Sequence, residues 1–147
     1  MELVELLKGV ELFAGMSEPQ LQRLAAISSI EEYHDGEIVV RQGETGDRLY
    51  VIQDGQVAVL VGDDLAVTPT LYLGQGQIVG EMALIDYGER SATIRCASKR
   101  AVLAVIKRDD FEALCSSDTA IGYIAMRNMA SDLSFKLRHR NLHPKSE

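Results

Sequence analysis

The sequence predicts a mainly β protein with flanking helices (α+β class), built as an antiparallel β-roll with N-terminal helices and a long C-terminal helix. Residues 30–106 consist of short β-rich runs separated by turn residues, and helical periodicity precedes and follows them. Twelve Gly against three Pro favour many tight turns. We expect a single domain over 1–147, with a helical N-terminus (1–29), a roll (30–106) and C-terminal helices (107–141).

Composition and charge exclude several classes of protein. Hydrophobic residues make up 46% and charged residues 25% of the 147 residues, as in soluble globular proteins. The net charge of −7 opposes general binding to nucleic acid, so an anionic ligand requires a local arrangement of donors. No apolar run approaches the length of a membrane span, and the N-terminus lacks the features of a secretory signal. We therefore expect a cytoplasmic protein without membrane or nucleic-acid partners, in which Cys96 and Cys115 are free thiols.

Two helices are expected before the roll. Apolar residues recur at helical spacing over residues 2–13, which predicts a helix that lies on a larger body. A second helix is expected to start at Ser17, a suitable N-cap, with Gln20 completing a capping box and Pro19 in the first turn.

The central region is read as a series of short strands. The expected strands are 38–40, 49–52, 57–61, 70–73, 92–94 and 101–106. Asp54-Gly55 separates the second and third of these, which predicts a two-residue hairpin. Gly62-Asp63-Asp64 is expected to form the next turn.

Helical signals return after the last strand. Asp109 or Asp110 is expected to cap a short helix, and Ser117 or Asp118 to cap a longer one that runs to about Asn141. The longer helix carries an apolar stripe, which is consistent with core packing and with dimerisation. The stripe consists of Met126, Met129, Leu133 and Leu137.

One stretch inside the β region breaks the strand pattern. Gly80 permits a close backbone approach, and residues 81–84 can form a short helical turn whose free N–H groups attract an anion. Arg90 adds a guanidinium fork and Ser91 a hydroxyl, which together make a phosphate cradle. Because the carboxylate of Glu81 does not favour phosphate, its natural partner is a neutral hydroxyl such as a ribose 2′-OH. The combination points to a nucleotide.

This stretch resembles the phosphate-binding cassette of cyclic nucleotide-binding domains, whose pattern is Gly-Glu-x-Ala-Leu, a short spacer and Arg-Ser/Ala/Thr-Ala. A second stretch, from Val39 through 43–47 to Gly55, is similar to the glycine-cornered strands that precede the cassette in this family. Two motifs in the right order are more specific than one glycine pattern. The resemblance covers about residues 5–140. The sequence departs from it at Glu89, because kinase regulatory domains of the family commonly have a Pro directly before the Arg.

The resemblance implies a set of phosphate and ribose contacts. Arg90 would pair with the exocyclic oxygens of a cyclic phosphate, to which Ser91 would donate its hydroxyl, and Glu81 would accept from the ribose 2′-OH. The remaining contacts would come from backbone N–H groups. The full set is Gly80, Glu81, Met82, Ala83, Arg90 and Ser91.

The resemblance also implies where the base lies. Three strand residues would face the purine: Val59, Thr70 and Leu73. Three residues of the C-terminal helix could cap it by stacking or cation–π contact: Phe135, Lys136 and Arg138. In bacterial activators of the family, hydroxyl side chains on this helix reach the adenine amino group, and residues 134–138 here lack an adjacent Ser/Thr pair. We favour cAMP over cGMP and leave the base open.

The expected function is a cyclic nucleotide sensor, without catalytic residues or cofactor, whose C-terminal helix changes conformation on binding. Its partner would be an effector protein or a second copy bound through that helix, and the chain would be a stand-alone sensor or part of a longer one. The alternative is a scaffold for docking or dimerisation in which the same roll leaves the ligand site unused. A separate alternative for Arg90 alone is a structural ion pair with Glu81 or Glu89. A metal enzyme is not supported, because His34 is the only histidine in the strand region and cannot form a metal site alone.

Overall fold

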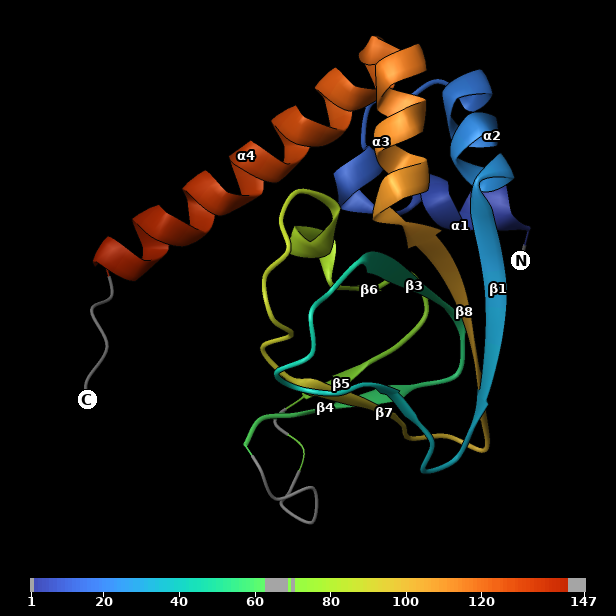
Figure 1. Cartoon of the computed structure of the whole chain (residues 1–147), viewed down its shortest axis with the longest axis vertical. Helices are drawn as coiled ribbons and strands as arrows, with labels where there is room; N and C mark the ends of the chain where they lie inside the picture. Colours follow the sequence, from blue (N-terminus) through green and yellow to red (C-terminus); the bar gives the residue numbers. More distant parts are fainter. Residues whose placement is uncertain (1, 63–68, 70, 143–147) are drawn as a thin grey trace.

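The computed structural model describes residues 2–62, 69 and 71–142, and within them eight antiparallel strands form two facing four-stranded sheets (Figure 1). The first sheet has the order β1-β8-β3-β6, with β1 (Ser28–His34), β8 (Arg100–Lys107), β3 (Arg48–Asp54) and β6 (Ile78–Val79). The second has the order β2-β7-β4-β5, with β2 (Ile38–Val40), β7 (Thr93–Cys96), β4 (Val57–Leu60) and β5 (Leu71–Leu73). The expected β-roll with flanking helices is confirmed. Thr70, predicted to face the purine from a strand, and Asp63-Asp64, predicted to form a turn, lie outside the described residues.

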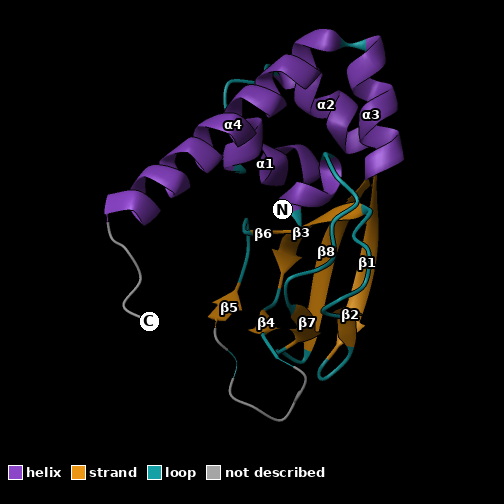
Figure 2. Cartoon of the chain, turned by 60° about the vertical axis from the view of Figure 1, so that its left-hand side comes forward, coloured by secondary structure: helices purple, strands orange, loops and turns teal. Residues whose placement is uncertain are grey.

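The helices gather at one end of the roll, and the long last helix projects away from it (Figure 2). They are α1 (Leu3–Lys8), the 3₁₀ turn η1 (Glu11–Phe13), α2 (Glu18–Ala26), α3 (Arg108–Ser117) and α4 (Thr119–Leu142). A further 3₁₀ turn, η2 (Glu81–Leu84), interrupts the strands. In the described part of the chain, no helix combines the length and hydropathy needed to cross a membrane.

Two hydrophobic clusters share the central strand β8. Leu103 and Val105 belong to the cluster inside the roll, whereas Ala104 and Ile106 belong to the cluster beneath the helices. Successive side chains of a strand point to opposite faces, so one strand contributes to both clusters. The roll and its helical cover are therefore packed together through β8.

The capping box of α2 forms as predicted. The Ser17 backbone N–H donates to Gln20 Oε1 at 2.8 Å, and the Gln20 N–H donates to Ser17 Oγ at 3.4 Å. Asp118 caps α4, because its carboxylate accepts from the Ile121 N–H at 3.4 Å. Cys96 is buried and Cys115 partly buried, and both are free thiols as expected.

Two helix predictions are wrong in detail. The helix expected over 2–13 ends at Lys8, and a separate 3₁₀ turn follows Gly9 and Val10. Neither Asp109 nor Asp110 caps α3, because β8 ends at Lys107 and the helix begins at the next residue, Arg108. The backbone N–H of Arg108 donates instead to the carbonyl of Asp47 at 2.8 Å, so a tertiary contact takes the place of a side-chain cap.

The hairpin predicted at Asp54-Gly55 is also wrong. The strands that it joins lie in different sheets: β3 pairs with β6 and β8, whereas β4 pairs with β5 and β7. The turn moves the chain from one sheet to the other. Gly55 has φ +83°, and a Cβ atom there would overlap the carbonyl oxygen of Arg100 and lie 2.9 Å from Ala101 Cα. The Gly is needed because β8 passes directly beside the turn.

Strands β1 and β6 were not predicted as such. The sequence of β1 mixes polar and apolar residues, with exposed or half-buried side chains throughout. Strand β6 has only two residues, Ile78 and Val79, which is too short for a periodic signal. Both strands lie at the edges of the first sheet, where they are recognised by pairing with β8 and β3.

We expect Gly55→Ala to lower the free energy of unfolding by about 2–4 kcal/mol, from the left-handed backbone and the overlap with β8. Gly36→Ala is the matched control, because Gly36 also has positive φ (+86°) but nothing lies within 4 Å of a Cβ there. Its cost should be about 1–2 kcal/mol, from the left-handed backbone alone. Urea unfolding of both variants measures the difference, and equal losses would show that the contact with β8 is unimportant.

Candidate functional site

The two sequence motifs are joined by backbone hydrogen bonds. The Gly43 N–H donates to the Arg90 carbonyl at 2.9 Å, and the Arg90 N–H donates to the Glu44 carbonyl at 2.7 Å. One step further, the Gly46 N–H donates to the Gly88 carbonyl at 3.0 Å. This short ladder aligns the loop of the first motif with the end of the second. It places Arg90 where the two motifs meet.

The cassette begins with a left-handed glycine. Gly80 has φ +82° and precedes η2, the short helical turn that the sequence predicted. Ala83 is buried, and its N–H donates to the Gly80 carbonyl at 3.0 Å within the turn. The side chain of Met82 is exposed. Residues 80–83 line the same hollow as Arg90.

Arg90 lies in a slot between two glycines. Its Nη2 donates to the Arg48 carbonyl at 2.9 Å. A Cβ atom at Gly46 would lie 3.0 Å from Arg90 Cζ, and one at Gly80 would overlap Arg90 Nη1. Each glycine comes from one of the two motifs. Their missing side chains leave room for the guanidinium against the backbone.

The surroundings keep Arg90 half-buried and positively charged. Burial lowers the pKa of Arg90, and nearby Tyr50 and Asp47 oppose this effect. A guanidinium remains protonated even so. Its Cζ atom lies 5.8 Å from the centroid of the Tyr50 ring. Among the ion pairs of the described residues, none joins Arg90 to Glu81 or Glu89, which removes the basis of the structural ion-pair alternative.

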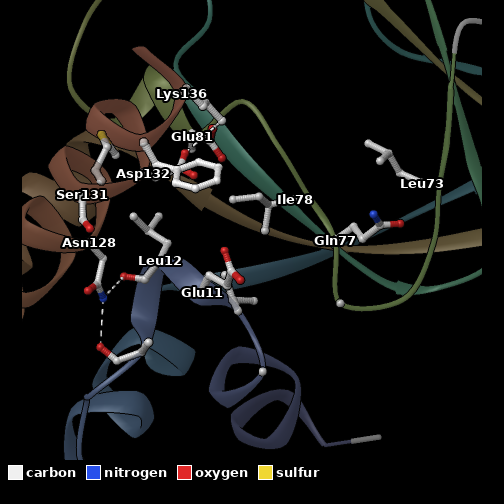
Figure 3. A pocket seen from close by; sticks show the side chains of 16 residues that line it. Glu11, Leu12, Leu73, Gln77, Ile78, Glu81, Asn128, Ser131, Asp132 and Lys136 are labelled. Atoms are coloured by element: carbon white, nitrogen blue, oxygen red, sulfur yellow. Dashed lines mark hydrogen bonds and ion pairs between the residues drawn. The ribbon is translucent and has the colours of Figure 1, made fainter. Parts of the chain in front are cut away.

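Most of the predicted site residues line two adjoining hollows in the surface. Ile78 and Glu81 line both of them. The smaller, of about 420 Å³, contains the whole set predicted for phosphate and ribose: Gly80, Glu81, Met82, Ala83, Arg90 and Ser91. The larger, of about 920 Å³, lies between η1, α4 and the segment from β5 to β6 (Figure 3). From the residues predicted near the base, it contains Leu73, Phe135 and Lys136.

Two residues predicted near the base lie elsewhere. Val59 lines neither hollow and packs, partly buried, against the cluster inside the roll. Arg138 also lines neither hollow, and its side chain is exposed on α4. Helical periodicity explains the second case, because Arg138 is two positions from Lys136 and therefore lies on another face of the helix.

Glu81 is paired with the last helix. Lys136 Nζ lies 3.5 Å from Glu81 Oε1 and 2.9 Å from Asp132 Oδ2 (Figure 3). The hydrogen bond to Asp132 raises the pKa of Lys136, burial opposes this effect, and the charge of Glu81 adds a smaller upward contribution. The residue expected to accept a ribose hydroxyl is thus already in contact with a cation from α4.

Several residues around the site were not singled out from the sequence. Asn128 and Asp132 line the larger hollow with Lys136, and the three are spaced four residues apart on α4. This spacing marks one face of a helix and could have identified them. Ile78 was missed because β6 was missed.

Arg108 connects the site to α3, and no sequence motif indicated this role. Its buried side chain donates from Nη1 to the carbonyls of Gly46 at 3.1 Å, Ala83 at 3.1 Å and Asp86 at 2.8 Å. Its Cζ atom lies 3.6 Å from the centroid of the Tyr87 ring. One side chain therefore holds the first motif, the cassette and the start of α3 together.

Comparison with known proteins supports the same reading of these motifs. Residues 30–118 match the family model of the cyclic nucleotide-binding domain. The chain is 31% identical over 110 residues to the cAMP-dependent protein kinase type II regulatory subunit of Drosophila melanogaster, covering 75% of this chain and 29% of that protein. It is 35% identical over 104 residues to the cGMP-dependent protein kinase of Eimeria tenella, covering 71% and 10%. The chain thus spans less than a third of these two relatives.

Solved structures share the fold over most of the chain. The N-terminal domain of a transcriptional regulator from Streptomyces coelicolor superposes with a TM-score of 0.84 at 23% identity, covering 97% of this chain and 99% of that one. The catabolite activator protein of Thermus thermophilus superposes with a TM-score of 0.75 at 27% identity, covering 90% and 61%. These likenesses confirm the fold, and the match of residues 30–118 to the family model shows that the chain belongs to the cyclic nucleotide-binding domain family.

Proposed function

We propose that this chain binds a cyclic nucleotide, cAMP in preference to cGMP, and acts as a cytoplasmic regulatory sensor with no catalytic activity of its own. The observation that carries the proposal is the smaller hollow, where the half-buried Arg90, the η2 turn and Glu81 converge. A guanidinium in a partly closed site binds phosphate through charge-assisted hydrogen bonds that are stronger than in water. Family membership supports the same ligand class.

The proposed pose places phosphate and base in the two adjoining hollows. The cyclic phosphate lies against Arg90, the Ser91 hydroxyl and the backbone of the η2 turn, and the ribose 2′-OH donates to Glu81. The base extends into the larger hollow toward Leu73 and Phe135, which line it. Because Glu81 lines both hollows, it lies where a ribose would join the two parts of the ligand.

The preference for cAMP is supported by relatives rather than by a contact. The cyclic AMP receptor protein of Thermus thermophilus is 29% identical over 140 residues, covering 92% of this chain and 61% of that protein. The Drosophila relative is also named for cAMP, whereas the Eimeria relative is named for cGMP. Titration calorimetry of the protein with each nucleotide tests the preference directly.

We expect Arg90→Ala to abolish most of the affinity for cAMP, with a loss of about 2–5 kcal/mol in binding free energy, because a charged partner of the phosphate is removed. Thermal unfolding without ligand should change little, since among the described residues the side chain makes one hydrogen bond, to the Arg48 carbonyl. Arg127→Ala is the control, because Arg127 is an exposed cation that lines neither hollow. Calorimetric titration of all three proteins gives the result.

Retained affinity in folded Arg90→Ala would overturn the assignment of the phosphate site. Absence of both heat and thermal shift when the unaltered protein meets either nucleotide would overturn the sensor proposal. The scaffold would then be the better explanation, with the cassette serving only as structure.

Ligand binding is proposed to move the helices through Arg108. The guanidinium holds carbonyls of the loop and the cassette, so a cassette drawn toward phosphate would carry the start of α3 with it. Because α4 follows α3 after Asp118, its orientation would change as well. The exposed side chains of Phe135 and Leu137 on α4 offer apolar surface to an effector protein or to a second copy.

We expect saturating cAMP to change amide hydrogen exchange in residues 107–140, because a shift between two helix positions requires that the ligand favours one of them. The strands inside the roll, such as β7, serve as an internal reference and should change less. Mass spectrometry of exchange with and without ligand makes the comparison. Identical exchange over 107–140 at saturation would contradict the proposed movement.

A further inference from the structure

Hydrogen bonds alone do not satisfy the buried guanidinium of Arg108. The side chain is 5% exposed, and its Nη1 donates to three backbone carbonyls. Its Nε is buried without a hydrogen-bond partner among the described residues. A buried donor that has no acceptor costs free energy, and the cost is greater when the group is charged. The junction between the cassette and α3 therefore needs a further contact that compensates this cost.

The ring of Tyr87 supplies such a contact. Arg108 Cζ lies over this ring, 3.6 Å from its centroid. A cation within about 6 Å of a ring centroid is attracted by the negative face of the ring, and the attraction is larger where water is excluded. The ring also covers one side of the planar group. It therefore stabilises the charge and keeps water from that side.

The position of Tyr87 argues against two simpler roles, in the core and in the ligand site. Its side chain is 69% exposed, so it adds little to the hydrophobic core. It lines neither hollow, although Asp86 and Gly88 on either side of it line the smaller one. An effect of the Tyr87 ring on ligand binding would therefore have to pass through Arg108.

The segment that carries Tyr87 is tied both to Arg108 and to the first motif. The Asp86 carbonyl accepts from Arg108 Nη1 at 2.8 Å, and the Asp86 carboxylate accepts from the Gly88 N–H at 3.0 Å. The Gly88 carbonyl accepts in turn from the Gly46 N–H at 3.0 Å. A looser guanidinium would therefore loosen the cassette beside the place proposed for the phosphate.

We propose that Tyr87 is a positioning residue: its ring keeps water from the Arg108 guanidinium and thereby preorganises the cassette for a ligand that Tyr87 does not touch. A preorganised site binds more tightly, because less ordering is required when the ligand arrives. The effect on ligand affinity rests on the proposed function. The exclusion of water from Arg108 does not, and it can be tested in the ligand-free protein.

The ligand-free test measures by NMR how fast the Nε–H proton of Arg108 exchanges with water. Removal of the ring in Tyr87→Ser should make this exchange about three- to thirty-fold faster, the range that corresponds to the strength of a cation–π contact. Tyr87→Phe keeps the ring and should exchange as the unaltered protein does. Tyr123→Ser is the matched control, because Tyr123 is 66% exposed and no contact of its ring with a cation is found among the described residues.

Equal exchange in Tyr87→Ser and in the unaltered protein would overturn the inference, whether or not the protein binds a nucleotide. Equally fast exchange in Tyr87→Phe and Tyr87→Ser would overturn it as well, because the ring would then not be the group that protects Arg108.

The second test measures the affinities of the same variants for cAMP and cGMP by titration calorimetry. Tyr87→Ser should bind about three- to ten-fold more weakly, because the cassette must then be ordered on binding. The factor should be the same for both nucleotides, since Tyr87 lines neither hollow and cannot contact the base. Tyr87→Phe and Tyr123→Ser should bind as the unaltered protein does.

Unchanged affinity in Tyr87→Ser would overturn the role in preorganisation, and a loss confined to one nucleotide would show a contact with the base instead. If the unaltered protein binds neither nucleotide, the proposed function fails, and exchange of the Arg108 Nε–H proton alone decides the role of Tyr87.

Discussion

The arrangement of the site depends on the burial of one charged side chain, Arg108. A buried guanidinium is costly unless its donors find acceptors. Here three backbone carbonyls share the two hydrogens of Nη1 and an aromatic ring covers the planar group, while Nε is buried without a hydrogen-bond partner among the described residues. The acceptors come from the loop of the first motif and from the cassette, while the arginine begins α3. Loop, cassette and helix are therefore held in one arrangement by a single requirement for hydrogen-bond acceptors.

The same arrangement explains how an acidic chain can provide a place for an anion. The net charge is −7, so long-range attraction does not favour a phosphate. The donors are local instead: Arg90 lies half-buried between Gly46 and Gly80, beside the start of a short helical turn. Close approach of backbone to guanidinium requires the absence of a side chain at both glycines. The proposed site is thus built from short-range geometry that acts against the overall charge.

The elements that could be predicted from sequence are those whose causes are local. The capping box at Ser17 and Gln20 is a contact between residues three apart, and the turn at 81–84 follows directly from Gly80. The prediction of a hairpin at Asp54-Gly55 was wrong because local turn residues do not specify which strands will pair. The start of α3 was misplaced for a related reason, since its first N–H is satisfied by Asp47, 61 positions earlier in the chain.

The sequence by itself determined the class of fold, the order of its parts, and the residues predicted to contact phosphate and ribose. These follow from periodicity, from turn residues and from two motifs, all of which are properties of short segments. Only the tertiary structure decided that Val59 and Arg138 lie away from the hollows. It also decided that Arg108 joins both motifs to α3 and that Lys136 pairs with Glu81. The side-chain hydrogen bonds of Arg108 and the contact of Lys136 with Glu81 join residues between 22 and 62 positions apart. They arise from the packing of whole elements, which no short segment encodes.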